Sequence, residues 1–350
     1  MGKVGIKDIA ERANVSTATV SYVLNGTRNV KPRTRERVLK VIEELNYTPN
    51  DIAKSLKSSR TNTIGVIAED VTVFNVPEII DGINHYADRN DMHILLTNLR
   101  LHKRVGHQYA DVDQYRKYAE NAVADLLSKQ VEGIIYIGVH PRDVTGLINS
   151  RGKPIVYTYC YTQNDLSIQY NDEQASFDAM NYLIGKGHRR IAIISGRMDS
   201  LPSRLRFNGF YKAVTESELP FDPQLIKVGD WGLQSGYELT QQLLALNEPP
   251  TAILVMNDIM AVGAMRAATE AGVRIPEELS LVGFDNREFS DYLNPRITTM
   301  DLPLQQMGYS SMEALSSLIK GEQPEGNYSP LCTLIERDSV ASPGSRQTPS

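Results

Sequence analysis

Apolar residues near the amino end of the chain recur at the spacing of short amphipathic helices. Residues 6–12 carry them three or four positions apart, which predicts a first helix. Asn14 follows, and because asparagine tolerates a left-handed backbone, a tight turn is expected there. Ser16 suits the N-cap of a second helix, which is expected over residues 17–24.

The second predicted helix has one apolar face and one slim polar face. Its apolar face is formed by Val20, Val23 and Leu24, and its polar face by Thr17, Ala18, Ser21 and Tyr22. A helix that enters the major groove, about 12 Å wide, needs a slim outer face that can hydrogen-bond. Two helices joined by a short turn therefore predict a helix-turn-helix. The alternative is a plain three-helix bundle that binds protein.

A third amphipathic helix is expected to start at Pro32, because proline suits the first turn of a helix. Its apolar stripe is predicted to consist of Val38, Leu39, Ile42 and Leu45. Residues 1–60 contain twelve Lys and Arg against six Asp and Glu, a net charge of +6, which leaves −11 on the rest of a chain whose total is −5. A basic head on an acidic body favours contact between the head and a polyanion.

From residue 63 onward, short apolar strands alternate with amphipathic helices. Strands are expected at 63–68, 93–98, 133–138, 154–158, 190–194, 251–256, 280–284 and 331–336. Helices are expected at 77–89, 115–130, 173–186, 203–215, 236–246, 260–271 and 303–320. This alternation predicts an α/β fold in which parallel sheets carry helices on both faces. Two rounds of it predict two lobes of similar topology.

Polar and aromatic residues stand where a ligand of such a fold would bind. Asn257 and Asp258 follow one predicted strand and Asp285, Asn286 and Arg287 follow another, and ligands of open parallel sheets bind beyond the carboxyl ends of the strands. Arg206 opens a predicted helix, and Trp231 is the only tryptophan. Charged and amide groups bind neighbouring hydroxyls while an aromatic face covers the C–H side of a sugar, so a sugar site in a cleft between the lobes is predicted.

Each of these residues also has a plainer interpretation. Asp258 is placed to cap the helix that follows it, Asp285 is a common turn residue, and Trp231 is a common core residue. Both interpretations remain open for each position.

No sequence motif of a catalytic, cofactor or metal site is present. The phosphate-binding, dinucleotide-binding and nucleophile-elbow patterns are missing, and the six histidines show no metal-ligand spacing. We therefore expect no enzyme activity, no cofactor and no metal. A periplasmic transport protein would share the two lobes, but it would need a signal peptide and would not need the basic head.

The remaining composition favours a cytoplasmic protein. No run of about 18 apolar residues predicts a membrane helix. Residues 1–10 lack the apolar region of a signal peptide. Cys160 and Cys332 lie far apart in the sequence and are expected as reduced thiols.

Three stretches of the chain resemble the LacI/GalR family of regulators. They are IKDIAERANVSTATVSYVLNG, PRTRERVLKVIEELNYTPN and RTNTIGVI, and the resemblance extends over nearly the whole chain. It implies a sequence-specific DNA-binding transcriptional regulator, a repressor of carbohydrate-utilisation genes. It also implies a homodimer on a pseudo-palindromic operator of double-stranded DNA, controlled allosterically by a small-molecule effector, a sugar in the inter-lobe cleft.

The resemblance also implies a domain organisation with a periplasmic-binding-protein-like core. The helix-turn-helix domain is expected at 1–49, a hinge helix and linker at 50–62, the effector-binding core at 63–340 and a flexible tail at 341–350. The first lobe is expected to comprise about 63–160 and 297–325, and the second about 161–296 and 326–340. The helix at 303–320 would return to the first lobe and the strand at 331–336 to the second.

Carried over by position, the resemblance makes Thr17, Ala18 and Tyr22 base readers. It places Ser16, Thr19, Ser21 and Asn25 on phosphates or in packing, and Asn50, Ala53 and Leu56 in the hinge helix. Leu56 would be a wedge in the minor groove, although an ordinary linker is the alternative for this segment. Most members carry Arg where Tyr22 stands, so Tyr22 is expected to read a different base or to read by apolar contact.

The effector contacts that the resemblance implies are Phe74, Tyr159, Tyr170, Arg206, Trp231, Asn257 and Asp285. Their aromatic content suits a disaccharide or an aryl glycoside. The sequence leaves open which sugar binds, and whether the effector releases DNA or promotes its binding.

Overall fold

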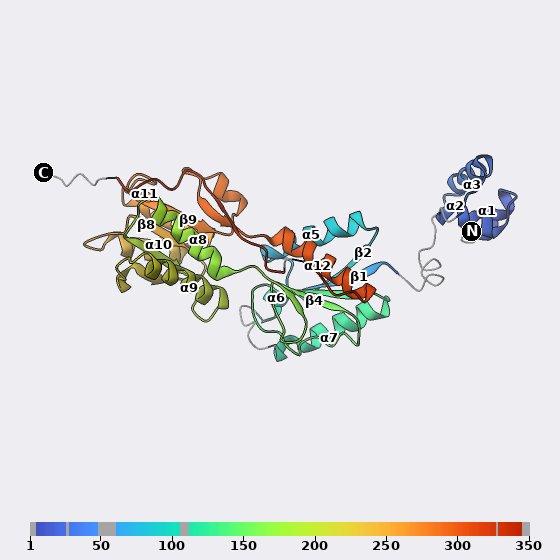
Figure 1. Ribbon diagram of the computed structural model, residues 1–350, viewed down its shortest axis with the longest axis horizontal. Helices are drawn as coiled ribbons and strands as arrows, with labels where there is room; N and C mark the ends of the chain where they lie inside the picture. The colour runs from blue at the N-terminus through green and yellow to red at the C-terminus, as the bar shows by residue number, and fades with distance from the viewer. Residues whose placement is uncertain (1–4, 26–27, 48–60, 106–111, 327, 345–350) are drawn as a thin grey trace. The chain divides into compact units, whose positions relative to one another are not determined.

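The computed structural model describes residues 5–25, 28–47, 61–105, 112–326 and 328–344 (Figure 1). The chain divides into two compact units, residues 1–61 and 62–350. The larger unit is an α/β structure with two sheets, as predicted. No helix in the described ranges is long and apolar enough to cross a membrane.

The smaller unit, which we call the head, consists of three helices around its own apolar core. They are α1 (Ile6–Arg12), α2 (Thr17–Asn25) and α3 (Pro32–Glu44). The buried residues at its centre are Ile9, Ala10, Ala13, Val20, Val23, Val38 and Val41. Asn14 has a φ of 48°, so the predicted left-handed turn between α1 and α2 is confirmed. Ser16 Oγ accepts a hydrogen bond from the Thr19 backbone N–H at 3.1 Å, which confirms the predicted N-cap.

The apolar stripe of α3 differs from the prediction at one position. Leu39 is 48% exposed, whereas Val41 is 7% exposed and packs in the core. Positions 38, 41, 42 and 45 share one face at helical spacing, while position 39 is turned by about 100° from position 38. Leu39 is therefore an exposed apolar side chain of the head.

The first lobe of the larger unit is built on a five-stranded parallel sheet. Its strand order is β2-β1-β3-β4-β5. The strands are β1 (Thr63–Ala68), β2 (His93–Asn98), β3 (Gly133–Ile137), β4 (Ile155–Thr158) and β5 (Leu166–Ile168). Its helices are α5 (Asn75–Arg89), α6 (Leu101–Val105), α7 (Asp113–Ser128) and α12 (Leu304–Lys320). Figure 1 shows α5 and α12 on one side of the strands and α7 on the other.

The second lobe is built on a six-stranded sheet in the order β11-β10-β9-β8-β6-β7. The strands are β6 (Ile191–Ser195), β7 (Ile226–Val228), β8 (Ala252–Val255), β9 (Ser280–Phe284), β10 (Thr298–Asp301) and β11 (Thr333–Ile335). Only β10 and β11 pair in antiparallel fashion. The helices are α8 (Asp172–Gly185), α9 (Leu201–Glu216), α10 (Leu233–Leu244) and α11 (Asp258–Glu270), with 3₁₀ turns at Pro223–Leu225 and Glu288–Asp291.

Two short strands belong to a different lobe from the one that the predicted boundaries imply. β5 pairs with β4 and so belongs to the first lobe, which extends past residue 160. β10 pairs with β9 and so belongs to the second lobe, although residues from 297 onward were expected in the first. The chain then enters the first lobe as α12 and returns to the second as β11. It therefore passes between the lobes three times.

Glycines let neighbouring helices of the larger unit approach closely. A Cβ atom built on Gly82 of α5 would lie 1.9 Å from the backbone oxygen of Gln305 in α12, and one on Gly308 would lie 1.9 Å from the oxygen of Ile79. The α8–α9 pair has the same device at Gly209, and the α10–α11 pair at Gly263. These positions admit no side chain without separating two helices.

We predict that Gly82→Ala destabilises the larger unit by about 3 kcal/mol, because the added methyl group meets backbone rather than a movable side chain. Gly185→Ala is the matched control, since no atom lies within 4 Å of its added Cβ and alanine favours a helix. The measurement is urea unfolding of both variants. Equal midpoints for the two would contradict the close packing of α5 and α12.

Candidate DNA-binding and effector sites

The second helix of the head presents the polar face that the sequence predicts. Thr17 and Ala18 are exposed in the first turn of α2, while Val20 and Val23 are buried against α1 and α3. Side chains at the start of such a helix are those that reach base edges in a helix-turn-helix. The core residues thus fix which face of α2 points outward.

Two further predicted residues of this helix bond to each other. Ser16 Oγ and Thr19 Oγ1 are 2.9 Å apart, and Ser16 also caps the helix. This pairing favours a role in positioning α2 over direct reading of bases. Asn50, Ala53 and Leu56 lie outside the described residues.

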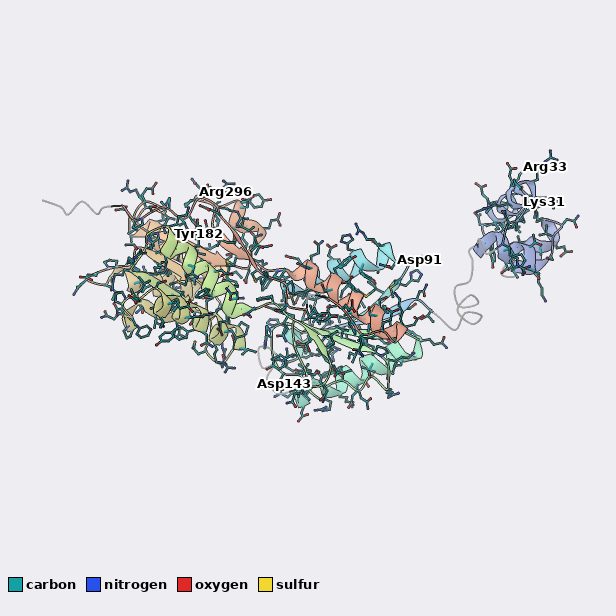
Figure 2. All side chains as sticks on the ribbon, viewed as in Figure 1. Lys31, Arg33, Asp91, Asp143, Tyr182 and Arg296 are labelled. Carbon is teal, nitrogen blue, oxygen red and sulfur yellow. The ribbon has the colours of Figure 1, made fainter. Side chains whose placement is uncertain are left out.

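Tyr22 is half-buried on α2 and lies beneath an arginine. The Arg28 Cζ is 5.0 Å from the centroid of the Tyr22 ring, a cation–π distance. Lys31 and Arg33, at the start of α3, are exposed and extend outward from the head (Figure 2). Arg28 therefore places positive charge beside α2, and the exposed Lys31 and Arg33 add positive charge to the surface of the head, which suits a phosphate backbone.

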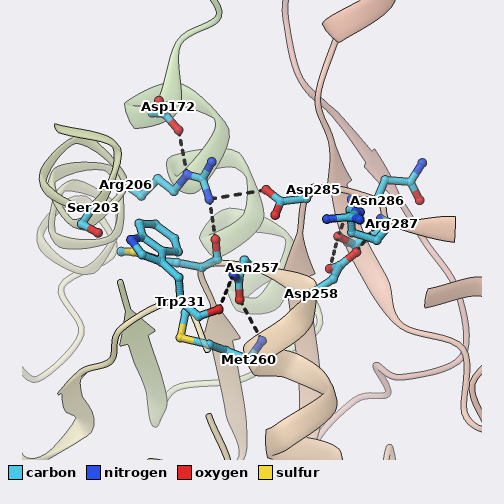
Figure 3. A network of polar contacts seen from close by, with 12 residues as sticks. Asp172, Ser203, Arg206, Trp231, Asn257, Asp258, Met260, Asp285, Asn286 and Arg287 are labelled. Atoms are coloured by element: carbon cyan, nitrogen blue, oxygen red, sulfur yellow. Dashed lines mark hydrogen bonds and ion pairs between the residues drawn. The ribbon is translucent and has the colours of Figure 1, made fainter. Parts of the chain in front are cut away.

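Arg206 is the centre of a buried network at the carboxyl ends of the strands of the second lobe (Figure 3). Its side chain is only 4% exposed. Arg206 Nε donates to Asp172 Oδ1 at 2.7 Å, Nη1 donates to the backbone oxygen of Met256, and Nη2 donates to Tyr170 Oη at 3.1 Å. Asp285 Oδ1 lies 3.8 Å from Nη1.

Aromatic rings surround the same guanidinium group. The Arg206 Cζ is 3.8 Å from the ring centroid of Phe284 and 5.8 Å from that of Trp231. Tyr170 stacks on Tyr159 with a centroid distance of 5.6 Å, and their hydroxyl oxygens are 3.1 Å apart. Both tyrosines are nearly buried, so they form a rigid aromatic wall beside the charge network.

A hydrogen bond joins the Asn257 side chain to the backbone of Trp231. Asn257 Nδ2 donates to the Trp231 backbone oxygen at 3.0 Å, and Asn257 Oδ1 caps α11 by accepting from Met260 N–H at 2.8 Å. A Cβ atom on Gly196 would lie 2.1 Å from the indole ring, so the indole rests on bare backbone at the end of β6. Trp231 has a φ of 75° and is half-buried.

Asp258 does not cap α11, because Asn257 does. Instead its carboxylate holds the loop that follows β9. Oδ2 accepts from the Arg287 backbone N–H at 2.8 Å and from Ser290 Oγ at 2.6 Å, and Oδ1 accepts from Thr299 Oγ1 at 2.7 Å. This carboxylate fixes the turn that carries Asp285.

Among the predicted effector residues, Phe74 is the one at the start of a first-lobe helix. It is the N-cap position of α5, and the Arg287 Cζ lies 4.6 Å from its ring centroid. Arg287 follows Asp285 by two positions, so Phe74 reaches the network through the second lobe's own loop. All seven predicted effector residues are thereby connected.

Asp258 and Arg287 stand at the strand ends that the sequence indicates but are not among the predicted effector contacts, and neither are Asp172 and Phe284. Asp172 stands in the first turn of a helix, where acidic residues are common for the helix dipole alone, so nothing in the sequence distinguished it. Arg287 adjoins the predicted Asp285 and was visible as the only cation of that loop. Its contact with the other lobe was not.

The first lobe has a buried ion pair of its own at the end of β1. Arg142 Nη1 donates to Glu69 Oε2 at 2.9 Å, Tyr136 Oη donates to Glu69 Oε1 at 2.6 Å, and the Val139 N–H donates to Oε2 at 2.9 Å. The Glu69 carboxylate is thus fully paired. The pair joins the segment after β3 to the end of β1.

Asp285 differs from Asp172 and Asp258, the other buried carboxylates of the network, in its hydrogen bonds. Its side chain is 6% exposed, and its carboxylate accepts no hydrogen bond from the part of the chain that the structure describes. Burial raises the pKa of Asp285 well above its usual value, against the opposing charge of Arg206. Within the described ranges, no group of three or more His, Cys, Asp or Glu is placed to hold a metal ion.

Two family models match the chain. Residues 5–50 match bacterial regulatory proteins of the lacI family, and residues 180–340 match a periplasmic binding protein-like domain. Catabolite control protein A of Priestia megaterium is 35% identical over 337 residues, which is 95% of this chain and 98% of the relative. The HTH-type transcriptional repressor PurR of Vibrio atlanticus (strain LGP32) is 34% identical over 96% of this chain and 98% of the relative.

Solved structures agree with these relatives. The Lac repressor dimer bound to operator and the anti-inducer ONPF has a TM-score of 0.77 and 30% identity, and covers 97% of this chain and 100% of that chain. The Lac repressor bound to ONPG in the repressed state has a TM-score of 0.78 and 31% identity over the same shares. The chain belongs to the lacI family and is a DNA-binding transcriptional regulator. Its named relatives are regulators rather than enzymes.

We predict opposite stability effects for the two carboxylates beside Arg206. Asp172→Asn removes the directly bonded partner of a buried cation and should cost about 3 kcal/mol. Asp285→Asn removes a buried carboxylate with a raised pKa and leaves the Arg206–Asp172 pair, so the variant should melt about 2 °C or more above the parent at pH 7.

The advantage of Asp285→Asn should depend on pH. The folded parent retains a proton that the unfolded chain releases, so its stability falls as pH rises toward the raised pKa of Asp285. The gap between the variant and the parent should therefore be smallest near pH 4 and widen to pH 8. A gap that stays constant in thermal unfolding across this range would refute the buried, proton-binding state of Asp285.

Proposed function

We propose that the chain represses carbohydrate-utilisation genes and that a sugar bound between the lobes controls its operator affinity. The observation that carries this proposal is the Asp285 carboxyl group, which has no hydrogen bond within the described ranges and lies 3.8 Å from Arg206, whose guanidinium group also faces the Trp231 ring. A carboxyl group forms hydrogen bonds with sugar hydroxyls whether it is ionised or protonated, while an indole covers the C–H face of a pyranose. The similar Lac repressor structures bound to the anti-inducer ONPF and to ONPG support a small-molecule effector for this chain as well.

The effector contacts in this proposal come from both lobes. Arg206, Trp231, Asn257 and Asp285 supply the second lobe's side, and Tyr170 lies in the segment that joins the lobes. Phe74 and Tyr159 supply the first lobe's side. A sugar held by both sides changes the free energy of one lobe arrangement relative to another, which is the requirement for allosteric control.

On the DNA side, Thr17, Ala18 and Tyr22 would read bases while Ser16, Thr19, Ser21 and Asn25 contact phosphates or position the helix. Asn50, Ala53 and Leu56 would form the hinge contacts. A homodimer places two such heads on a pseudo-palindromic operator, as in the Lac repressor dimer bound to operator. The protein would work in the cytoplasm, where the chromosome is, and by binding rather than catalysis.

The sugar prediction is tested by a screen on purified protein. Mono- and disaccharides are added while thermal unfolding and the emission of Trp231, the chain's single tryptophan, are followed. A sugar that binds should raise the midpoint, alter the emission and change operator affinity by about 5–150-fold. Asp285→Asn, which keeps the fold, should lose the response. A parent that binds operator but answers no sugar contradicts the proposal.

Tyr22 has a prediction of its own. Selection from a random-centre duplex library should give a pseudo-palindromic consensus for the parent. Tyr22→Ala should lose preference at one base pair in each half-site, a loss of about 1–3 kcal/mol there, with little change elsewhere. Lys31→Ala is the control, because a phosphate contact weakens binding to all sequences equally. An unchanged consensus for Tyr22→Ala would remove Tyr22 from the base readers.

A further inference from the structure

Arg287 stands on a turn of the effector network that hydrogen bonds hold in place. Asp285 and Asn286, which precede it, have φ values of 100° and 48°. The Arg287 backbone N–H donates to the buried Asp258 carboxylate at 2.8 Å, and Asn286 Nδ2 donates to Asp301 Oδ1 at 2.9 Å. The backbone of Arg287 is therefore held in place, and its side chain leaves the second lobe in a defined direction.

That side chain contacts the first lobe. The Arg287 Cζ is 4.6 Å from the ring centroid of Phe74, within the range of a cation–π interaction, and 5.8 Å from that of Phe289. Phe74 begins α5 of the first lobe, whereas Arg287 follows β9 of the second. One aromatic ring and one guanidinium group thus meet from opposite lobes beside the predicted effector site.

The donors of this guanidinium group are uncommitted. Within the described ranges its nitrogens make no hydrogen bond and no ion pair, although the group is half-buried. The neighbouring arginines differ, since Arg206 bonds to Asp172 and Arg337 bonds to Asn286 and Asp291. A guanidinium that rests on an aromatic face keeps its five N–H groups in its own plane, free to donate.

The next residue along the first lobe adds a second unpaired group. Asn75 follows Phe74 and is fully buried, yet neither its Nδ2 nor its Oδ1 has a hydrogen-bond partner. Buried amides are nearly always paired, so an unpaired one at this place indicates that the start of α5 is built to receive polar groups.

The charges around Arg287 decide which kind of group it would receive. Glu78, one turn into α5, feels both Asp301 and Arg287, and burial together with Asp301 raises the pKa of Glu78 against the opposing charge of Arg287. Asp301, which accepts a hydrogen bond from the neighbouring Asn286, is a second acidic group near this one guanidinium. An anionic ligand would meet that negative surplus, whereas a hydroxyl pair would not.

We propose that Arg287 is an effector-binding residue that donates to two adjacent hydroxyls of an uncharged sugar while Phe74 supports its guanidinium plane. This inference rests on the proposed sugar control and adds to it a residue, a donor geometry and a charge class for the effector. Because the ring and the guanidinium belong to different lobes, the same contact responds to the placement of the lobes.

The test pairs protein variants with sugar variants. Glucose, galactose, xylose, maltose, cellobiose and melibiose are titrated against Trp231 emission, followed by each monodeoxy form of those that bind. Arg287→Met keeps the length and apolar contact of the side chain and should bind the sugar about 10–100-fold more weakly. Arg287→Lys keeps the charge without the planar fork and should fall between Arg287→Met and the parent.

One deoxy sugar should separate a direct contact from a structural role. The parent should lose about tenfold in affinity when the hydroxyl facing Arg287 is removed, and Arg287→Met should bind both forms alike. Arg274→Met is the control, since Arg274 is an exposed arginine paired with Glu278, and it should match the parent throughout. If every deoxy form costs the parent and Arg287→Met equally, Arg287 does not contact the sugar.

Two further readouts complete the test. Operator binding without sugar is measured beside sugar binding, and a loss of operator affinity in Arg287→Met as large as its loss of sugar affinity would make Arg287 a lobe contact only. Glucuronic acid should bind more weakly than glucose, and tighter binding would overturn the uncharged class. If the parent binds operator but none of these sugars, sugar control itself is wrong. If the parent binds a sugar and Arg287→Met binds it with equal affinity, only the assignment of Arg287 is wrong.

Discussion

The structure of the larger unit depends on keeping the charge of Arg206 buried. A guanidinium group that is nearly inaccessible to water persists only if every side of it is paired, because its desolvation costs several kcal/mol. Tyr170 and Asp172 come from the segment that opens α8 and the Met256 carbonyl from the end of β8, and both segments must stand in register to bond to it. The need to pair the Arg206 charge therefore orders the carboxyl ends of the strands of the second lobe.

Each lobe buries an arginine beside a carboxylate, but the two lobes differ in whether that carboxylate is fully hydrogen-bonded. In the first lobe, Glu69 is completely bonded by Arg142, Tyr136 and Val139, so nothing there remains for a ligand. In the second lobe, Asp285 lies at 3.8 Å from Arg206 and has no hydrogen bond within the described ranges. One lobe thus offers a closed network and the other an open one. A ligand that adds hydrogen bonds gains most at the open one, and Arg287 extends that open edge to Phe74 of the first lobe.

Hydrophobic periodicity was sufficient to predict most of the fold. Apolar strands such as 63–68 and 280–284 were located to the residue, since a buried parallel strand leaves a continuous apolar run. β5 and β10 were not predicted as strands. β5 has only three residues, and β10 reads Thr-Thr-Met-Asp, whose buried polar groups are paired only by tertiary partners such as Asp258. Leu39 was wrongly predicted to be buried, because the sequence of one helix does not show which of its apolar residues pack against the neighbouring helices.

The site shows where sequence reasoning stops. Strand ends located Asn257 and Asp285, and composition pointed to Trp231, but the function of each depends on contacts that no spacing encodes. Asn257 caps a helix and holds the Trp231 backbone at once, while Asp258, the more obvious cap, holds a loop instead. Asp258 fixes the turn that carries Asp285 and Arg287, and through that turn the packing of the core positions both side chains.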